Sequence, residues 1–437
     1  MNIFTVDFSN SLCTQAELLP LLKKLEPEIE RVKKSFSDKY CSVYASLNLP
    51  TDVDYHAMVQ AMIDEKKQLL LSSLFVIGIG GSNLGIQAIQ EALGGILYNE
   101  TEHSLKIYYA DTVDADYLQT LLMIAQKELQ QGNHILVNVI TKSGATTETI
   151  VNFELFIQLL QHYHPDTYND YIVVTTDENS VLWEIGKKNN YSLIPIPFNV
   201  GGRFSVLSAV GLFPLGMLHM PIYDLLAGAA SMLPLAVEKI DYNLIAHSAA
   251  TMYVHYCKGI VIQDMFVFSH QLRSIGAWYR QLMGESIGKE KDIHGNIVEV
   301  GITPTVSVGS VDLHSVGQLY LGGPRDKCST FVTIENNAHE ILVPHLAEFE
   351  KSVANIQGKS VSSIMHALVE GVKTAYQKNQ RPFVALALPE ISAWYVGQLL
   401  QFKMIEMMYL GYVLEINPFD QPNVESYKTE TRKLLAQ

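Results

Sequence analysis

A cluster of hydroxyl side chains lies in residues 137–149, whose sequence is VNVITKSGATTET. An apolar strand pattern precedes the cluster, Gly144 permits a tight turn, and a helical pattern follows. A helix that begins here points unpaired N–H groups back at the turn, where hydroxyls can also donate to phosphate oxygens. The stretch is typical of an anion-binding site, although a Ser/Thr-rich helix N-cap would look similar in isolation. The side chains that could contact an anion are Thr141, Lys142, Ser143, Thr146 and Thr147.

A second unusual loop, with the sequence GIGGS, covers residues 78–82 and follows another strand pattern. Two of its glycines fit the beginning of a dinucleotide fingerprint, but Asn83 replaces the third glycine and no Gly-Lys-Ser/Thr follows. We therefore favour a loop whose small residues let Ser82 and backbone N–H groups approach a ligand, and disfavour a nucleotide site.

Three separate side chains could stabilise charge or move protons. Arg203 follows two glycines and can lie along a cleft, Glu285 ends a helical pattern between glycines, and His314 lies near a predicted helix start. Each also has an ordinary structural use, as a buried ion pair, a solvated helix end or a core histidine. From the residues alone, both interpretations stay open.

The C-terminal segment 417–428 carries an amide, a carboxylate and an amine. Pro422 suits the first turn of a helix, which puts Gln421, Glu425 and Lys428 on one face. In isolation this would be a solvent-exposed salt-bridge face.

Alternating strand and helix patterns predict the elements that position these residues. Strands are expected at residues 74–79, 104–110, 135–140 and 171–175, with helices at 84–93, 117–131 and 147–161. This alternation predicts a parallel sheet flanked by helices, with ligands at the carboxyl ends of the strands. A second alternation predicts strands at 259–268, 331–335 and 383–388 and helices at 272–283, 362–376 and 391–408.

The first 72 residues are predicted to be helical, at 16–34 and 57–71, with Pro20, Pro27 and Pro50 as breakers. The complete division that we expect is a helical segment 1–72, a first sheet domain 73–198, a second 199–410 and a C-terminal segment 411–437.

Composition limits the function classes. The 437 residues are enough for two domains, and a net charge of −14 argues against nucleic-acid binding. Four scattered cysteines favour neither zinc nor disulfides and fit a reducing cytoplasm. Without a signal-peptide or membrane-span pattern, we expect a soluble cytoplasmic protein that makes no membrane contact.

Six segments together resemble the glucose-6-phosphate isomerase family. NVGGRFSVLSAVG and LGYVLEINPFDQPNVESYK are similar to its two signature segments, and GIGGS, ITKSGATTET, QLMGESIGK and DLHSVGQ to its other site segments, in the same order. The resemblance runs from about residue 75 to 428 and is greatest to the shorter bacterial members. It implies an α/β fold of two sugar-isomerase domains, each a mainly parallel sheet sandwiched by helices, with helical N- and C-terminal extensions. It also implies a homodimer with shared active sites between the domains.

The resemblance assigns roles residue by residue. Glu285 resembles the base, Arg203 the enediolate stabiliser, and His314 and Lys428 the ring-opening groups. The implied phosphate site is Gly81, Ser82, Thr141, Lys142, Ser143, Thr146 and Gln421. Gly202 and Gln281 complete the implied substrate site. Asn423 replaces a family glycine, and we expect the turn to survive because Asn tolerates a left-handed backbone.

The implied reaction interconverts D-glucose 6-phosphate and D-fructose 6-phosphate, in glycolysis and gluconeogenesis, without a cofactor or a metal. It needs a base between C1 and C2, charge stabilisation for an enediolate, and an acid/base pair for ring opening. Two alternatives remain: an isomerase that also takes mannose 6-phosphate, and a non-catalytic phosphosugar-binding regulator on the same domains.

Overall fold

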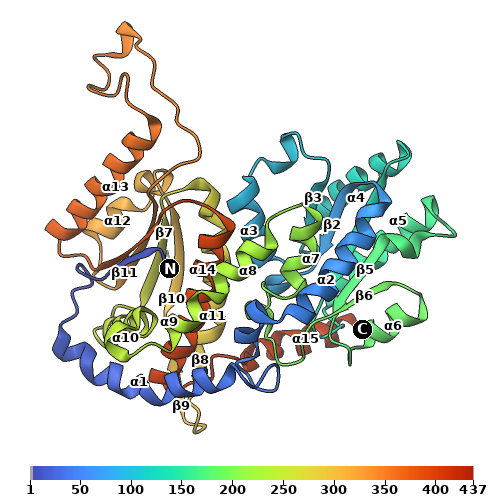
Figure 1. The fold of residues 1–437 in the computed structure, drawn as a ribbon, viewed down its shortest axis with the longest axis horizontal. Helices are drawn as coiled ribbons and strands as arrows, with labels where there is room; N and C mark the ends of the chain where they lie inside the picture. The colour runs from blue at the N-terminus through green and yellow to red at the C-terminus, as the bar shows by residue number, and fades with distance from the viewer. Residues whose placement is uncertain (1–2, 437) are drawn as a thin grey trace. The chain divides into compact units, whose positions relative to one another are not determined.

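The computed structural model describes residues 3–436, and the chain divides into two compact units. Unit 2 is the continuous stretch Glu30–Leu233, and unit 1 combines Met1–Ile29 with Pro234–Gln437. Each unit contains one five-stranded sheet (Figure 1).

The sheet of unit 2 is entirely parallel, in the order β3-β2-β4-β5-β6. Its strands are β2 (Leu71–Ile77), β3 (Lys106–Ala110), β4 (His134–Ile140), β5 (Ile172–Thr176) and β6 (Ser192–Pro195). Its helices are α2 (Val53–Lys66), α3 (Leu84–Gly94), α4 (Ala115–Gln130), α5 (Thr147–Tyr163), α6 (Val181–Lys188), α7 (Ala209–Met217) and α8 (Ile222–Ala230).

Both faces of this sheet are buried. Phe75 and Val137 pack with the apolar side chains of α4 and α5 in one cluster, while Leu74, Val76 and Leu136 are buried on the opposite face. Burial on both sides explains why these strands are nearly continuous apolar runs.

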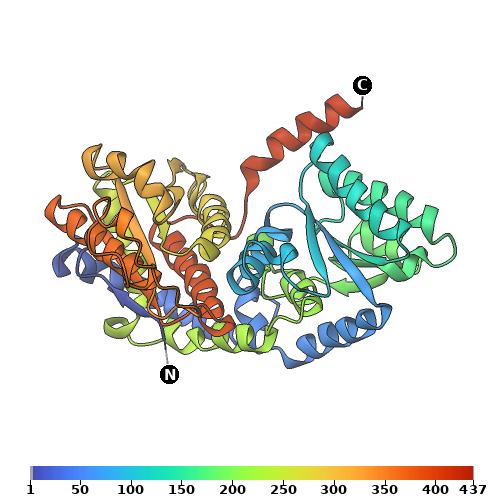
Figure 2. The same ribbon diagram turned by 90° about the horizontal axis from the view of Figure 1, so that it is seen from above.

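The sheet of unit 1 has the order β1-β12-β11-β7-β10. The edge strand β1 pairs antiparallel with β12, and the other strands are parallel. Its strands are β1 (Thr5–Asp7), β7 (Ile262–Val267), β10 (Thr303–Val308), β11 (Lys327–Ile334) and β12 (Phe383–Leu388), and a separate hairpin consists of β8 (Lys289–Lys291) and β9 (Ile297–Val300). Its helices are α9 (Met232–Ala236), which begins at the unit boundary, α10 (Leu244–Cys257), α11 (Arg273–Ile287), α12 (Gly317–Gly322), α13 (Val361–Lys378), α14 (Ala393–Val413) and α15 (Glu425–Leu435). Figure 2 shows α15, in red at the C-terminus, extending away from the rest of unit 1, and none of its residues is buried.

The predicted alternation of strands and helices is confirmed in both units, with bounds shifted by a few residues. The sequence patterns missed the short strands β1, β6 and β10 and the β8–β9 hairpin, because so few residues give no clear period.

The prediction that Pro20 and Pro27 break the N-terminal helix is wrong. Both prolines lie inside one continuous helix, α1 (Gln15–Ser35). An interior proline costs about 3 kcal/mol, so tertiary packing must offset this cost. The buried apolar side chains of α1, at helical spacing, are Leu18, Leu22, Leu25, Ile29 and Val32.

A long segment, residues 335–360, connects β11 to α13 in unit 1, and we call it the arm. Its only helix or strand is the short 3₁₀ helix Ala347–Phe349. Figure 1 shows it in orange, projecting away from the sheet of unit 1. Its exposed apolar side chains are Ile341, Leu342, Leu346, Phe349 and Val353. Within residues 3–436, no helix is both long and apolar enough to cross a membrane.

Candidate active site

The hydroxyl cluster of unit 2 forms a loop between the end of β4 and the start of α5. Thr141 Oγ1 lies 2.9 Å from Thr146 Oγ1 and 3.5 Å from Ser143 Oγ, and the Ser143 and Thr146 hydroxyls are 3.4 Å apart. Thr146 is the N-cap residue of α5 without a side-chain capping bond, so its hydroxyl is directed into the cluster. We call these three hydroxyls, with Lys142 and the first N–H groups of α5, the cradle.

The backbone of the cradle is fixed by its neighbours. Gly144 has φ +67°, and a Cβ there would lie 2.7 Å from Ser180 Cβ, so a side chain would be both strained and blocked. The hydroxyl of Thr176, at the end of β5, donates to the Thr141 carbonyl at 2.6 Å. The hydroxyls are therefore held close together before any ligand binds.

Lys142 is the cation of the cradle. Burial lowers its pKa below the usual lysine value, and the nearby Asp177 opposes that shift. Its Nζ lies 5.9 Å from the centre of the Phe198 ring. An anion bound here would favour the charged form of Lys142.

The GIGGS loop lies against the segment that carries Arg203. A Cβ on Gly81 would be 2.3 Å from the carbonyl carbon and oxygen of Gly202 and 2.7 Å from the backbone N of Arg203. The close approach requires glycine at position 81, and it brings Ser82 and Arg203 into neighbouring loops of unit 2. Arg203 is only 2% exposed.

A polar pair to which the sequence patterns gave no role lies beside this loop. Asn83 Nδ2 donates to Asp111 Oδ2 at 2.7 Å, while the buried Asn83 Oδ1 has no hydrogen-bond partner. Burial raises the pKa of Asp111, and the Asn83 bond opposes that shift. The available signal was the position of both residues just after strands β2 and β3.

In unit 1, Gln281 and Glu285 lie one turn apart near the end of α11. Gln281 Nε2 donates to Glu285 Oε1 at 3.0 Å, whereas the buried Gln281 Oε1 has no hydrogen-bond partner. The amide thus fixes one oxygen of the carboxylate, as a positioned base requires.

His314 ends a short 3₁₀ helix, Val311–His314, and is exposed. Asp312 holds this turn, because its carboxylate accepts from the Val308 N–H and from the Ser315 hydroxyl, both at 2.7 Å. The following helix α12 is attached to the sheet through Tyr320, whose hydroxyl lies 3.0 Å from Asp264 Oδ1.

Lys428 forms an ion pair with Glu425 at 2.6 Å on the first turns of α15, and this pair lowers the pKa of Glu425. Gln421 precedes the 3₁₀ helix Pro422–Val424. Asn423 lies inside that right-handed turn, so the tolerance of Asn for a left-handed backbone is not needed in this conformation. Its side chain instead donates to Glu290 Oε2 at 2.8 Å.

The implied site residues therefore fall into two groups. Unit 2 carries the cradle, Ser82 and Arg203, while unit 1 carries the acid–base side chains. Among residues 3–436, no group of three or more His, Cys, Asp or Glu side chains is arranged to hold a metal ion.

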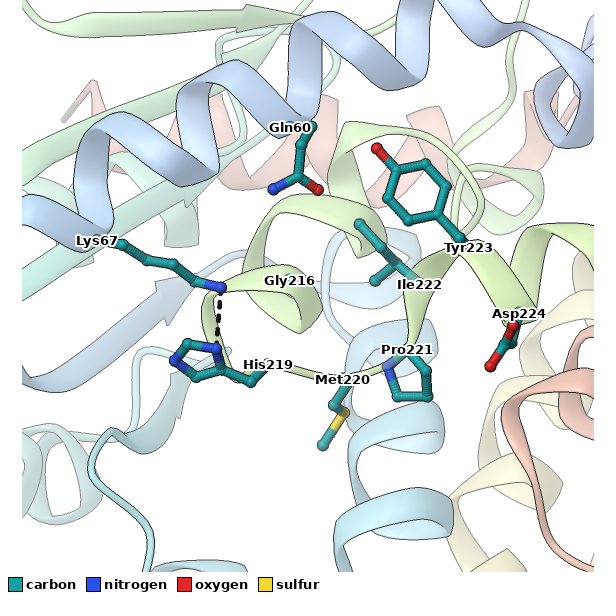
Figure 3. A pocket seen from close by; sticks show the side chains of 9 residues that line it. All are labelled: Gln60, Lys67, Gly216, His219, Met220, Pro221, Ile222, Tyr223 and Asp224. Carbon is teal, nitrogen blue, oxygen red and sulfur yellow. Dashed lines mark hydrogen bonds between the residues drawn. The ribbon is translucent and has the colours of Figure 1, made fainter.

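A cavity of about 340 Å³ in unit 2 lies away from the cradle (Figure 3). Lys67 Nζ approaches His219 Nδ1 at 3.1 Å on one side of it, and Asp224 lies on the other. Lys67 precedes the start of β2 and the cradle follows the end of β4. Because β2 and β4 are parallel, Lys67 and the cradle lie at opposite ends of the strands. No residue implied by the resemblance lines this cavity.

Sequence comparisons find one family over most of the chain. A profile of the family described as "Phosphoglucose isomerase" matches residues 65–437. The glucose-6-phosphate isomerase of Carboxydothermus hydrogenoformans is 34% identical over 366 residues, covering 82% of this chain and 78% of the relative. That of Streptococcus pyogenes serotype M6 is 34% identical over 398 residues, covering 89% and 86%.

Solved structures with the same fold include a hypothetical protein from Thermus thermophilus, with a TM-score of 0.88, 28% identity and 100% coverage of both chains. A glucose-6-phosphate isomerase from Chlamydia trachomatis has a TM-score of 0.84 at 22% identity, covering 99% of this chain and 88% of the other. These likenesses agree with the expected fold class of parallel sheets flanked by helices.

Proposed function

Because this chain belongs to the phosphoglucose isomerase family, we propose that it interconverts D-glucose 6-phosphate and D-fructose 6-phosphate. The observation that carries the proposal is the family match to residues 65–437, since that span contains every residue of the two groups, from Gly81 to Lys428. The enzyme class is an aldose–ketose isomerase, and its substrate is a sugar phosphate.

The cradle binds the phosphate group in this proposal. Its hydroxyls already lie within 3.5 Å of one another, so a phosphate replaces hydroxyl–hydroxyl bonds by stronger charge-assisted bonds. Lys142 and the N-terminus of α5 add positive potential in a protein of net charge −14. Ser82, the Gly81 backbone and Gln421 complete this role.

Glu285 acts as the base. It takes the proton from C2 of the open-chain sugar and returns it to C1, through an enediolate whose negative charge Arg203 stabilises. The proton of the C2 hydroxyl passes to the C1 oxygen in the same interconversion, so that the aldehyde becomes a hydroxyl and C2 becomes the carbonyl. A buried arginine suits this task, because it stays protonated where the dielectric constant is low. Gln281 holds the carboxylate in place, and the Gly202 backbone leaves room for the sugar.

His314 and Lys428 open the ring. One group delivers a proton to the ring oxygen and the other removes the proton from the C1 hydroxyl, so that no net charge is added to the sugar.

We also propose that the enzyme is a homodimer whose partner subunit shares in the active site. The exposed apolar side chains of the arm support this assembly, because such residues gathered on one projecting segment are typical of an interface.

A cytoplasmic location is in keeping with four cysteines that form no disulfide within residues 3–436.

A coupled assay with glucose, fructose and mannose 6-phosphates, each with and without a metal chelator, tests the activity. We expect turnover of both glucose 6-phosphate and fructose 6-phosphate, and for each of them the same rate with and without chelator. Turnover mainly of mannose 6-phosphate would favour the broader isomerase, and binding without any turnover would favour the regulator.

Mixing of two inactive variants tests the shared site. If Glu285 and His314 serve one site from different subunits, subunit exchange between Glu285→Gln and His314→Ala proteins restores part of the activity. A fully active monomer in sedimentation at the assay concentration would contradict the dimer.

A further inference from the structure

Lys289 contacts two of the chain segments of unit 1 that carry acid–base residues, those of Glu285 and of Lys428. It lies two residues beyond α11, opens β8, and is 6% exposed. Its Nζ donates to the Glu285 carbonyl at 2.8 Å and to the Asp420 carbonyl, and forms an ion pair with Asp420 Oδ1 at 3.2 Å. One ammonium group thus bonds to both segments.

The first of these bonds satisfies a helix end. Because α11 ends at Ile287, the Glu285 carbonyl lies in the last turn of the helix, where side chains commonly donate to backbone carbonyls. A cation is also favoured there by the helix dipole. The residue whose backbone is held is the proposed base itself.

The second and third bonds fix the C-terminal segment. Asp420 immediately precedes Gln421, and the neighbouring Glu290 accepts from Asn423 at 2.8 Å. Two consecutive residues of the β8 strand therefore hold the C-terminal segment on both sides of Gln421, a few residues before Lys428.

From this geometry we propose that Lys289 is a positioning residue of the isomerase, which fixes the Glu285 backbone and the segment of Gln421 and Lys428 relative to each other. The inference rests on the proposed function. A base must be held within about 0.5 Å of its productive position, and a misplacement of about 1 Å can cost a hundredfold in rate. Lys289 acts through these backbones and needs no contact with the sugar.

A purely structural ion pair would behave differently in one respect. Because Glu285 carries the proton between C1 and C2, its position sets how much deuterium from 2-deuterated glucose 6-phosphate reaches C1 and how much is lost to water. Loss of stability alone changes the amount of folded enzyme and leaves this ratio unchanged.

The test compares Lys289→Met with a matched control, Lys327→Met. Lys327 is also a buried lysine of unit 1 that donates to a backbone carbonyl, of Pro324 at 3.0 Å, and pairs with an aspartate, Asp326. It lies at the start of β11, at the opposite end of the parallel strands from the residues that follow β10.

For Lys289→Met we expect kcat to fall by roughly ten- to a hundredfold, KM to change less, and the transferred fraction of label to drop. Lys327→Met should lower the melting temperature similarly but keep the wild-type kcat per folded molecule and the wild-type label ratio. Lys289→Arg, which keeps a cation, should recover part of the loss.

Asp420→Asn removes the charge that pairs with Lys289, keeps the backbone carbonyl acceptor, and also alters the carboxylate oxygen that accepts from Asn417. This variant decides the matter if Lys289→Met does not fold. Under the proposal it lowers kcat several-fold and also lowers the transferred fraction. An unchanged label ratio in all folded variants at positions 289 and 420 would overturn the positioning role, with the isomerase activity intact. A wild-type protein that isomerises neither hexose phosphate would overturn the proposed function as well.

Discussion

The cradle in unit 2 and the acid–base residues in unit 1 are held in place by different means. In the cradle, Thr141, Ser143 and Thr146 hydrogen-bond to one another within one loop. In unit 1, Glu285, His314 and Lys428 come from separate elements, and contacts between distant parts of the chain position those elements.

This difference matters for what each region must do. An anion site tolerates small errors, because several hydroxyls and N–H groups share one charge. Proton transfer between two carbons does not tolerate them, because the base must reach both. We therefore expect substitutions in the cradle to change mainly binding, and substitutions of the acid–base residues of unit 1 to change mainly turnover.

The largest effect is expected at Glu285. Glu285→Gln keeps the size of the side chain but cannot accept the proton, so kcat should fall by about a thousandfold, within the ~10²–10⁴ range of a general base. Binding of 6-phosphogluconate, measured by calorimetry, should change little. Near-normal turnover, or complete retention of deuterium by the wild-type enzyme, would contradict its role as base.

A second substitution tests the cradle. Thr146→Ala removes one hydrogen bond to a charged group, of about 1.5–3 kcal/mol, so the affinity for substrate and for 6-phosphogluconate should fall roughly ten- to a hundredfold. The kcat at saturating substrate should stay close to the wild-type value. A large loss of kcat with normal affinity would remove the distinction between the two regions.

The charge of Lys142 gives a smaller, pH-dependent effect. Since burial lowers its pKa, the free enzyme loses this cation at a lower pH than an exposed lysine would, and affinity for a phosphate dianion should fall several-fold as pH rises toward 10. Lys142→Arg keeps its charge and should show a flatter profile. Inhibition by inorganic phosphate, measured between pH 7 and 10, gives the affinity profile of the wild type and of Lys142→Arg. Parallel profiles for the two proteins would argue that Lys142 does not contact the anion.

The smallest effect, on stability, is expected at Asp264, which holds the helix α12 that follows His314. Asp264 is buried beneath α12, accepts hydroxyl bonds from Thr305, Ser307 and Tyr320, and has its pKa raised by burial. A raised folded-state pKa means that its contribution to stability is complete below the unfolded pKa of about 3.9 and is lost as pH rises through the folded value.

Asp264→Asn cannot ionise, so the melting temperature of the wild type relative to this variant should be highest near pH 4 and should decline by a few degrees toward pH 8. Other titrating groups are common to both proteins and cancel in the difference. A difference that grows with pH would show that Asp264 is stabilised as the anion.

The sequence predicted the cradle because all of its determinants are local: a strand end, a glycine at positive φ and hydroxyls on one turn. It also predicted the central strands, where burial on both faces leaves an apolar run. It could not show that Asn423 bonds to Glu290, because the two residues are far apart in the chain. Lys289 lies inside the QLMGESIGK motif, yet its partner Asp420 is equally distant. Pro20 and Pro27 did not act as breakers, because packing outweighed local propensity.

The pairing of β1 with β12 has a consequence for how the chain folds during synthesis. Unit 2 is one continuous stretch and is complete when residue 233 has been made, whereas the first strand of unit 1 must wait for residues 383–388. At about 5–20 residues per second, that wait on the ribosome is roughly 20 to 80 seconds. Throughout it, strand β1 has no sheet partner, so its backbone N–H and C=O groups stay open to chaperones and proteases.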